Sequence, residues 1–92
     1  MPLIPVTIPG LLRHAIGEAT ETVIDAATLS ELIAKLKQKH PLLVPLLWDE
    51  TGELRKHVLI FYNDTATRWL DSKDQPLKDG DKVAVMQAIS GG

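Results

Sequence analysis

The sequence of 92 residues contains no cysteine. Disulfide frameworks, thiolate zinc sites, CxxC redox pairs and cysteine nucleophiles are therefore excluded. Long hydrophobic runs are also missing, because no apolar stretch approaches the roughly 20 residues of a membrane-spanning helix. The first residues lack the basic region and the long apolar stretch of a signal peptide. We therefore expect a cytoplasmic protein with no membrane partner.

An excess of positive charge is absent as well. Ten lysine and arginine residues are set against twelve aspartate and glutamate residues, which gives a net charge of −2. Binding to a nucleic-acid backbone needs a concentrated positive field, so we expect no nucleic-acid partner. The chain is 45% hydrophobic and 24% charged, which is ordinary for a globular protein. Its length suits one small domain.

Motifs typical of enzymes and metal sites are missing too. His14, His40 and His57 have neither the i, i+4 spacing of a helical metal site nor a nearby third ligand in sequence. The sequence contains no Gly-x-Ser-x-Gly motif, and its glycines form no phosphate-binding loop. We therefore expect no bound metal, no bound cofactor and no catalytic residue in this chain.

The N-terminal part of the chain has the pattern of two strands. Apolar residues alternate with proline or threonine over residues 4–8, which predicts a strand with one buried face. Pro5 has no N–H group, so the strand must leave this position unpaired or end beside it. Residues 10–20 are predicted as a loop and residues 21–25 as a second strand. The two strands should form a hairpin with a long connection.

One amphipathic helix follows. Thr28 and Glu31 form a capping-box signature, in which each side chain accepts a hydrogen bond from the other residue's backbone N–H. The apolar residues that follow recur at helical spacing; they are Leu29, Leu32, Ile33 and Leu36. Pro41 should end the helix at His40, where a cationic ring would favour the helix dipole. Residues 42–47 are predicted as a short turn that packs over the edge of the core.

Three further strands are predicted in the C-terminal part. Residues 58–62 form a dense β-branched and aromatic run, which ends at the turn residues Asn63-Asp64. Residues 65–70 are predicted to pair back as a short strand. The turn Asp79-Gly80-Asp81 leads into a last strand, which begins at Val83 and extends toward Ile89.

Two sets of side chains could suggest binding, but each has a simpler interpretation. Trp48 and Trp69 are more commonly part of a small core or its edge than of a ligand site. Lys35, Lys37 and Lys39 are expected on the solvated face of the helix.

The number and order of the elements favour an α+β roll. We expect a mixed sheet of four to five strands with one main helix packed on one face. Neighbouring residues of the strand at 58–62 point to opposite faces, so large apolar groups must remain on the face that the helix does not cover. Leu59 and Phe61, with Met86 on the last strand, are the candidate residues of a partner interface on that face.

The sequence ends in Ser90-Gly91-Gly92, directly after the last predicted strand. Two glycines at fixed positions arise by chance in roughly one chain in 200. A frayed end is the simplest interpretation. Alternatively, Gly91 and Gly92 form a strip without side chains that can enter a narrow enzyme channel and present the terminal carboxylate. We therefore divide the chain into a domain of residues 1–89 and a flexible tail of residues 90–92.

The order of elements, the Asp79-Gly80-Asp81 turn leading into Lys82-Val83-Ala84-Val85, and the terminal Gly91-Gly92 resemble the ubiquitin-like β-grasp sulfur carriers. This family includes the carriers of thiamine and cysteine biosynthesis and the small subunit of molybdopterin synthase. The cysteine-pathway carrier is the most similar to this sequence. Further landmarks of the resemblance are Ile8-Pro9, Leu11-Leu12-Arg13, Thr28-Leu29, His40-Pro41, Gly52-Glu53-Leu54-Arg55 and Tyr62-Asn63-Asp64.

The resemblance implies a role as a protein co-substrate. A ubiquitin-activating-like enzyme that uses MgATP would adenylate the carboxylate of Gly92, and a sulfur donor would displace AMP to leave a thiocarboxylate. A cysteine-synthase-like enzyme, the large subunit of molybdopterin synthase or a thiamine-pathway enzyme would then accept the sulfur. Two other functions remain open. The chain could be a protein modifier joined through Gly92 to lysines of other proteins, or a β-grasp interaction module with an inert tail.

Overall fold

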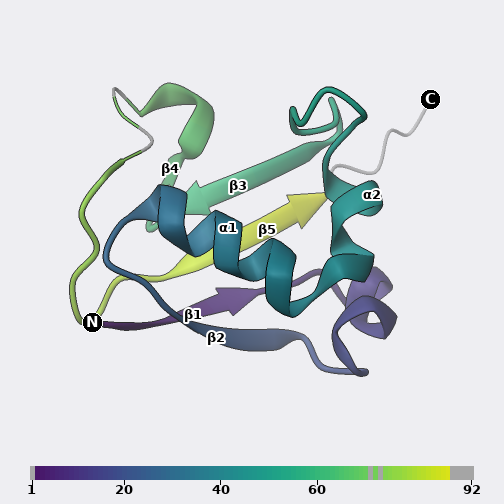
Figure 1. Cartoon of the computed structure of the whole chain (residues 1–92), viewed down its shortest axis with the longest axis horizontal. Coiled ribbons are helices and arrows are strands. Elements are labelled where there is room, and N and C mark those ends of the chain that lie inside the picture. Colours follow the sequence, from purple (N-terminus) through teal and green to yellow (C-terminus); the bar gives the residue numbers. More distant parts are fainter. Residues whose placement is uncertain (1, 71, 73, 88–92) are drawn as a thin grey trace.

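A five-stranded mixed sheet with a long helix across one face forms the framework of the molecule (Figure 1). The structure is a computed structural model, and it describes residues 2–70, 72 and 74–87. The strand order is β2-β1-β5-β3-β4, and the strands are β1 (Leu3–Thr7), β2 (Glu21–Asp25), β3 (Val58–Tyr62), β4 (Thr65–Ala66) and β5 (Val83–Gln87). The helix α1 covers Leu29–Lys39. The predicted α+β class and the single main helix are confirmed.

The first two strands form the predicted antiparallel hairpin. Their register runs from Leu3 opposite Asp25 to Thr7 opposite Glu21. The first strand begins and ends one residue earlier than the sequence predicted. Its parallel pairing with β5 begins at Val6, after Pro5, as expected for a residue that cannot donate a backbone hydrogen bond.

The connection between β1 and β2 is not the predicted loop. Residues Gly10–Ile16 form a 3-10 helix, η1, which buries Leu12, Ala15 and Ile16 against the core. Leu12 and Ala15 are three residues apart, which places both on one face of a 3-10 helix. The turn ends at Gly17, whose φ of 76° lies in the left-handed region that glycine adopts without strain.

The start of α1 confirms half of the predicted capping box. The Thr28 hydroxyl accepts a hydrogen bond from the backbone N–H of Glu31 at 3.2 Å. The Glu31 carboxylate, however, accepts from the N–H of Ala27 at 2.7 Å and not from that of Thr28. The helix ends at His40, as predicted, and two short helices follow, η2 (Pro41–Leu43) and α2 (Val44–Leu47). Leu43 and Leu47 close the edge of the core.

The face of the sheet that α1 covers carries the core. On β3 the alternate residues Val58, Ile60 and Tyr62 are buried, and on β5 the residues Val83 and Val85 are buried. They pack with the buried face of the helix, which consists of Leu29, Leu32 and Leu36. Of the two possible orientations of β3, the structure thus selects the one in which Leu59 and Phe61 face away from the helix.

Two of the three helix lysines are anchored to the backbone of β2. The Lys35 and Lys39 ammonium groups donate hydrogen bonds to the carbonyls of Asp25 and Val23, at 2.6 and 3.2 Å. Because β2 is an edge strand, these contacts occupy carbonyls that no neighbouring strand pairs. The lysines lie on the solvent-facing side of the helix, as predicted, and two of them also anchor the helix to β2.

His40 is the C-terminal cap residue of α1, and its backbone N–H donates to the carbonyl of Leu36. Its Nε2 lies 3.0 Å from the Thr22 hydroxyl. Burial and the adjacent Lys39 lower the pKa of His40 below 6.5, so the predicted cationic interaction with the helix dipole is not favoured.

The two tryptophans differ. Trp48 is buried in the core, as predicted. Trp69 is 78% exposed, so the prediction that it packs in the core or at its edge was wrong. The reason is that the predicted strand at 65–70 ends after Ala66. The chain then forms a short 3-10 helix, η3 (Thr67–Trp69). Arg68 therefore also lies in a helix and not on a strand.

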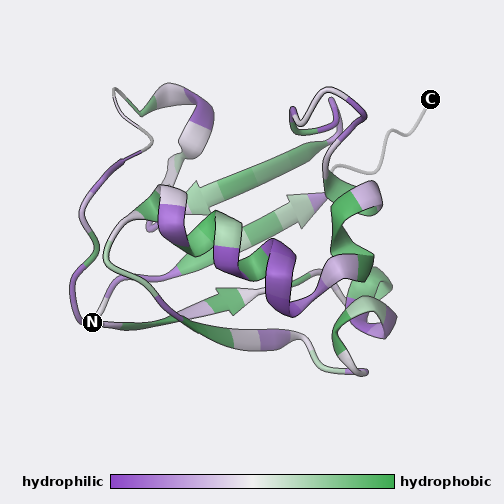
Figure 2. Ribbon diagram, viewed as in Figure 1, coloured by the Kyte–Doolittle hydropathy of each residue, from purple (hydrophilic) through white to green (hydrophobic). Residues whose placement is uncertain are grey.

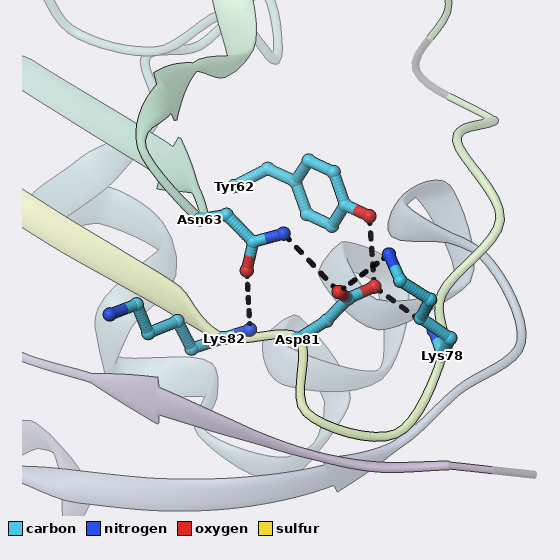
Figure 3. A network of polar contacts seen from close by, with 5 residues as sticks. All are labelled: Tyr62, Asn63, Lys78, Asp81 and Lys82. Carbon is cyan, nitrogen blue, oxygen red and sulfur yellow. Dashed lines mark hydrogen bonds and ion pairs between the residues drawn. The ribbon is translucent and has the colours of Figure 1, made fainter.

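A buried carboxylate fixes the turn that leads into β5 (Figure 3). Asp81 is only 3% exposed. It accepts hydrogen bonds from the Tyr62 hydroxyl at 2.8 Å, the Asn63 amide at 3.2 Å, the Lys78 N–H at 3.0 Å and the Lys78 ammonium at 3.1 Å. Asn63 in turn accepts from the N–H of Lys82 at 3.0 Å. The network thus ties the end of β3 to the start of β5.

Burial opposes the ionisation of Asp81, but hydrogen bonds from Lys78, Tyr62 and Asn63 outweigh it and lower the pKa of Asp81 to about 2. A carboxyl whose pKa falls on folding stabilises the native state at higher pH. This contribution is complete above about pH 4 and is lost as the pH falls toward 2.

We expect Asp81→Asn to lower the free energy of unfolding by about 2 kcal/mol at pH 7, because it removes an ionised acceptor of several buried hydrogen bonds. Urea unfolding measures the loss. The exposed Asp79 supplies the matched control, since Asp79→Asn should change stability by less than about 0.5 kcal/mol. The difference between Asp81→Asn and the native protein should also shrink between pH 4 and pH 2. Equal losses in the two variants would contradict the role of the network.

Candidate functional site

The face of the sheet opposite α1 carries the predicted interface residues. Leu59 and Phe61 of β3 are half-buried, and Met86 of β5 is 52% exposed. Leu59 lies directly opposite Met86 in the antiparallel ladder, and Phe61 lies directly opposite Ala84. Figure 2 shows that β3 and β5 are hydrophobic along most of their length, which places apolar groups on both faces of the sheet. The structure therefore brings the three predicted residues together. We call this surface the open face.

The open face continues onto β1 and β2, which the sequence reasoning missed. Thr7 lies beside Ala84, and Pro5 lies opposite Val23, so these positions share the face. On it, Leu3 is 65% exposed and Val23 is 43% exposed. The alternation within each strand already contained this information. The order of the strands, which the sequence did not reveal, was needed to place Leu3 and Val23 on the same face of the sheet as Met86.

The open face has one acidic border. Glu21 and Asp25 are exposed and share the parity of Val23 on the edge strand β2. The centre of the face, over β5 and β3, is apolar. This arrangement fits a partner surface with an apolar centre and a basic edge.

The open face lies next to the point where the chain leaves the sheet. Gln87, the last residue of β5, pairs with Val58, the first residue of β3, and Met86 directly precedes Gln87. The predicted tail residues Ser90, Gly91 and Gly92 lie outside the described residues. Five residues follow Gln87, and five residues span at most about 17 Å. A partner that binds the C-terminal carboxylate must therefore also contact the folded domain near the end of β5.

The described part of the chain has neither a candidate metal site nor a candidate membrane span. No group of three histidine, aspartate or glutamate side chains there could hold a metal ion. Within the same residues, no helix is both long and apolar enough to span a membrane.

Comparison with known proteins identifies relatives over nearly the whole chain. The model of the ThiS family matches residues 6–92. The sulfur carrier protein CysO of Mycobacterium tuberculosis is 29% identical over 91 residues, which cover 97% of this chain and 98% of that protein.

Solved structures share the fold. A chain of the Amycolatopsis orientalis BexX/CysO complex aligns with a TM-score of 0.80 and 27% identity, over 97% of this chain and 99% of the other. The small archaeal modifier protein 1 of Methanosarcina acetivorans aligns with a TM-score of 0.76 and 26% identity, over 100% of this chain and 98% of the other. Both structures confirm the predicted β-grasp arrangement.

We expect Met86→Ser to change the free energy of unfolding by less than about 0.5 kcal/mol, because the Met86 side chain is on the open face. The neighbouring Val85 points to the core and is the matched comparison. Val85→Ser should lower the free energy of unfolding by about 2–4 kcal/mol, since it removes buried methyl groups and introduces a hydroxyl. Urea unfolding of both variants measures these changes. A similar loss of unfolding free energy in both would show that the open face is buried in the native protein.

Proposed function

Because the chain belongs to the ThiS family of ubiquitin-like sulfur carriers, we propose that it carries sulfur as a thiocarboxylate on Gly92 and delivers it to a biosynthetic enzyme. The observation that carries this proposal is the family match, which extends to the last residue of a sequence that ends in Gly91-Gly92. In this role the chain is a co-substrate and its partners supply the catalysis.

The chemistry needs an activated terminus, because a carboxylate is a poor acyl donor until one of its oxygens becomes a leaving group. A carboxylate oxygen of Gly92 attacks the α-phosphorus of MgATP on the activating enzyme, and pyrophosphate leaves. A sulfide equivalent from a donor then attacks the carbonyl carbon, and AMP leaves with the original oxygen. The product is a terminal thiocarboxylate. The chain has no cysteine, so it has no internal thiol to compete for the activated carbonyl.

The open face is the proposed docking surface for the activating enzyme. Leu59, Phe61 and Met86 offer apolar contacts beside the last residue of β5. A few apolar anchors dominate the binding energy of most protein interfaces. The tail, with Ser90, Gly91 and Gly92, would add little contact area and would instead determine entry into the active site. The BexX/CysO complex of Amycolatopsis orientalis shows that a similar carrier binds another protein, which supports this proposal.

The similarity to CysO favours an acceptor of the cysteine-synthase type. Delivery of sulfur to a molybdopterin-synthase or thiamine-pathway enzyme would use the same activated terminus and the same thiocarboxylate. The identity of the acceptor is therefore a separate proposal from the carrier role.

Protein modification is the second candidate function, favoured by the structural similarity to the small archaeal modifier protein 1. It would use the same adenylate, with a lysine amine as the nucleophile in place of sulfide. The product would be an isopeptide bond to Gly92. Trypsin cleaves after Lys82, so a modified target lysine would carry residues 83–92 as a branch.

We expect the intact mass of the protein, isolated gently from its native host, to include a form in which one oxygen is replaced by sulfur. Fragmentation should locate the change at Gly92, because this carboxylate is the proposed site of adenylation. Incubation with MgATP and host extract should increase the amount of this form. A variant that ends at Ser90 is the control, and it should fold normally but remain unmodified.

The same experiment separates the alternatives. If no thiocarboxylate forms in extract, the carrier proposal is wrong. Branched peptides that carry residues 83–92 would then identify a modifier, and their absence would leave an interaction module with an inert tail.

We expect Phe61→Ala to lower kcat/KM for ATP–pyrophosphate exchange by the activating enzyme about five- to thirtyfold, the effect of removing one apolar anchor. Met86→Ser should act in the same direction. Leu42, which is exposed after the end of α1 and away from the sheet, is the matched control, and Leu42→Ala should leave the exchange rate unchanged. Unchanged kinetics for both open-face variants would reject this docking surface without affecting the carrier role.

A further inference from the structure

A second concave surface lies on the helix side of the sheet, away from the open face. It is a groove of about 640 Å³ between α1, the segment 48–54 and η3. In Figure 1, α1 crosses in front of β5, and β3 lies beside it. The helix therefore leaves part of the inner face of β3 to be covered by shorter segments, and the groove is formed where they meet.

The floor of the groove is apolar. Ile60 of β3, Leu29 of α1 and Trp48 are buried side chains that line it, and Ile33 and Leu54 line it as half-buried side chains. The wall formed by segment 48–54 is fixed by backbone pairing, because Trp48 bridges to Leu54 and the N–H of Asp49 donates to the carbonyl of Glu53 at 2.8 Å. Backbone hydrogen bonds therefore hold this wall of the groove in place without a ligand.

Two cations from separate elements border this floor. Lys37 projects from α1, and its ammonium lies 4.5 Å from the centre of the Trp48 ring. Arg68 projects from η3, and its guanidinium donates to the carbonyl of Val58 at the long distance of 3.5 Å. Within the described residues, neither Lys37 nor Arg68 forms an ion pair with a carboxylate. Both cations therefore keep donor capacity for a ligand.

One acidic side chain, Glu53, also lines the groove. It is exposed and lies on the wall opposite α1. An anionic ligand would be attracted by Lys37 and Arg68 and repelled by Glu53. Removing either cation should therefore weaken the binding of an anionic ligand, whereas removing the Glu53 charge should strengthen it. Substitutions can thus test whether the ligand is anionic.

We propose that this groove binds an extended peptide segment of a partner protein in which acidic residues alternate with bulky apolar residues. The apolar side chains contact Ile60, Trp48 and Leu54, and the carboxylates pair with Lys37 and Arg68. The inference does not depend on the carrier role, because the groove and the open face lie on opposite sides of the sheet.

The test uses a capped five-residue peptide in which aspartate alternates with leucine. Titrated into the isotopically labelled full chain, it should shift the amide resonances of segments 29–37, 48–54 and 67–69. A neutral peptide with asparagine in place of aspartate is the matched ligand and should bind at least severalfold more weakly. Added salt should weaken only the acidic peptide.

Variants test the assignment of the charges. Lys37→Met and Arg68→Met should each weaken binding of the acidic peptide about two- to fivefold, the range for partly exposed charge pairs. Glu53→Gln should strengthen binding by a similar factor. Lys56→Met removes an exposed cation outside the groove and should have no effect. The amide spectrum of each variant shows whether its fold is retained.

Several results would overturn the proposal. These are equal binding of the neutral peptide, shifts confined to Leu59, Phe61 and Met86 on the open face, and no shift at millimolar peptide. An unchanged affinity in Glu53→Gln together with unchanged affinities in both cation variants would also reject the charge assignment.

Discussion

The burial of one face of the sheet by a single long helix determines most of this structure. The apolar stripe of α1 meets the alternate residues of β3 and β5 that point toward it, and these contacts form the core. Among residues 2–70, 72 and 74–87, no second long helix covers the other face. The apolar residues on that face therefore stay accessible, and the surface proposed for docking is a direct result of how the core is built.

The strand register decides which residues reach each face. A slip of one residue would exchange Met86 with Val85 and Phe61 with Ile60. Asp81 opposes such a slip, because it holds Tyr62 and Asn63 at the end of β3 against the turn that begins β5. The network lies at one end of β5 and the exit of the chain lies at the other. A buried carboxylate at the start of the strand thus supports the position of the residues that lie beside the tail.

The open face and the groove on the helix side have different chemistry. The open face is broad, with an acidic border on β2, and it adjoins the last residue of β5. The groove on the helix side is narrower and has cations from α1 and η3 above an apolar floor. A partner suited to one surface would meet unfavourable charges on the other. Under the two proposals, the domain would distinguish two partners by charge while one small core supports both surfaces.

The sequence alone determined the local features of this protein. Thr28 and Pro41 bounded the helix, alternation predicted β1 and β5, and a dense β-branched and aromatic run predicted β3. The absence of cysteine and the terminal glycines left the C-terminal carboxylate as the candidate site for sulfur. These features depend on residues close together in the chain, so their patterns are visible in one dimension. The tail itself lies outside the described residues, and its role stays a prediction.

Only the tertiary structure decided which faces meet. Both faces of β3 are apolar, so alternation could not tell whether Ile60 or Phe61 points to the helix. The exposure of Trp69, the helix at 10–16 and the anchoring of Lys35 on β2 depend on neighbours distant in sequence. Strand order placed Leu3 and Val23 on the same face as Met86, and the groove arose from three segments far apart in the chain. Side-chain type and spacing specify local backbone structure, whereas contacts between distant segments depend on how the whole core packs.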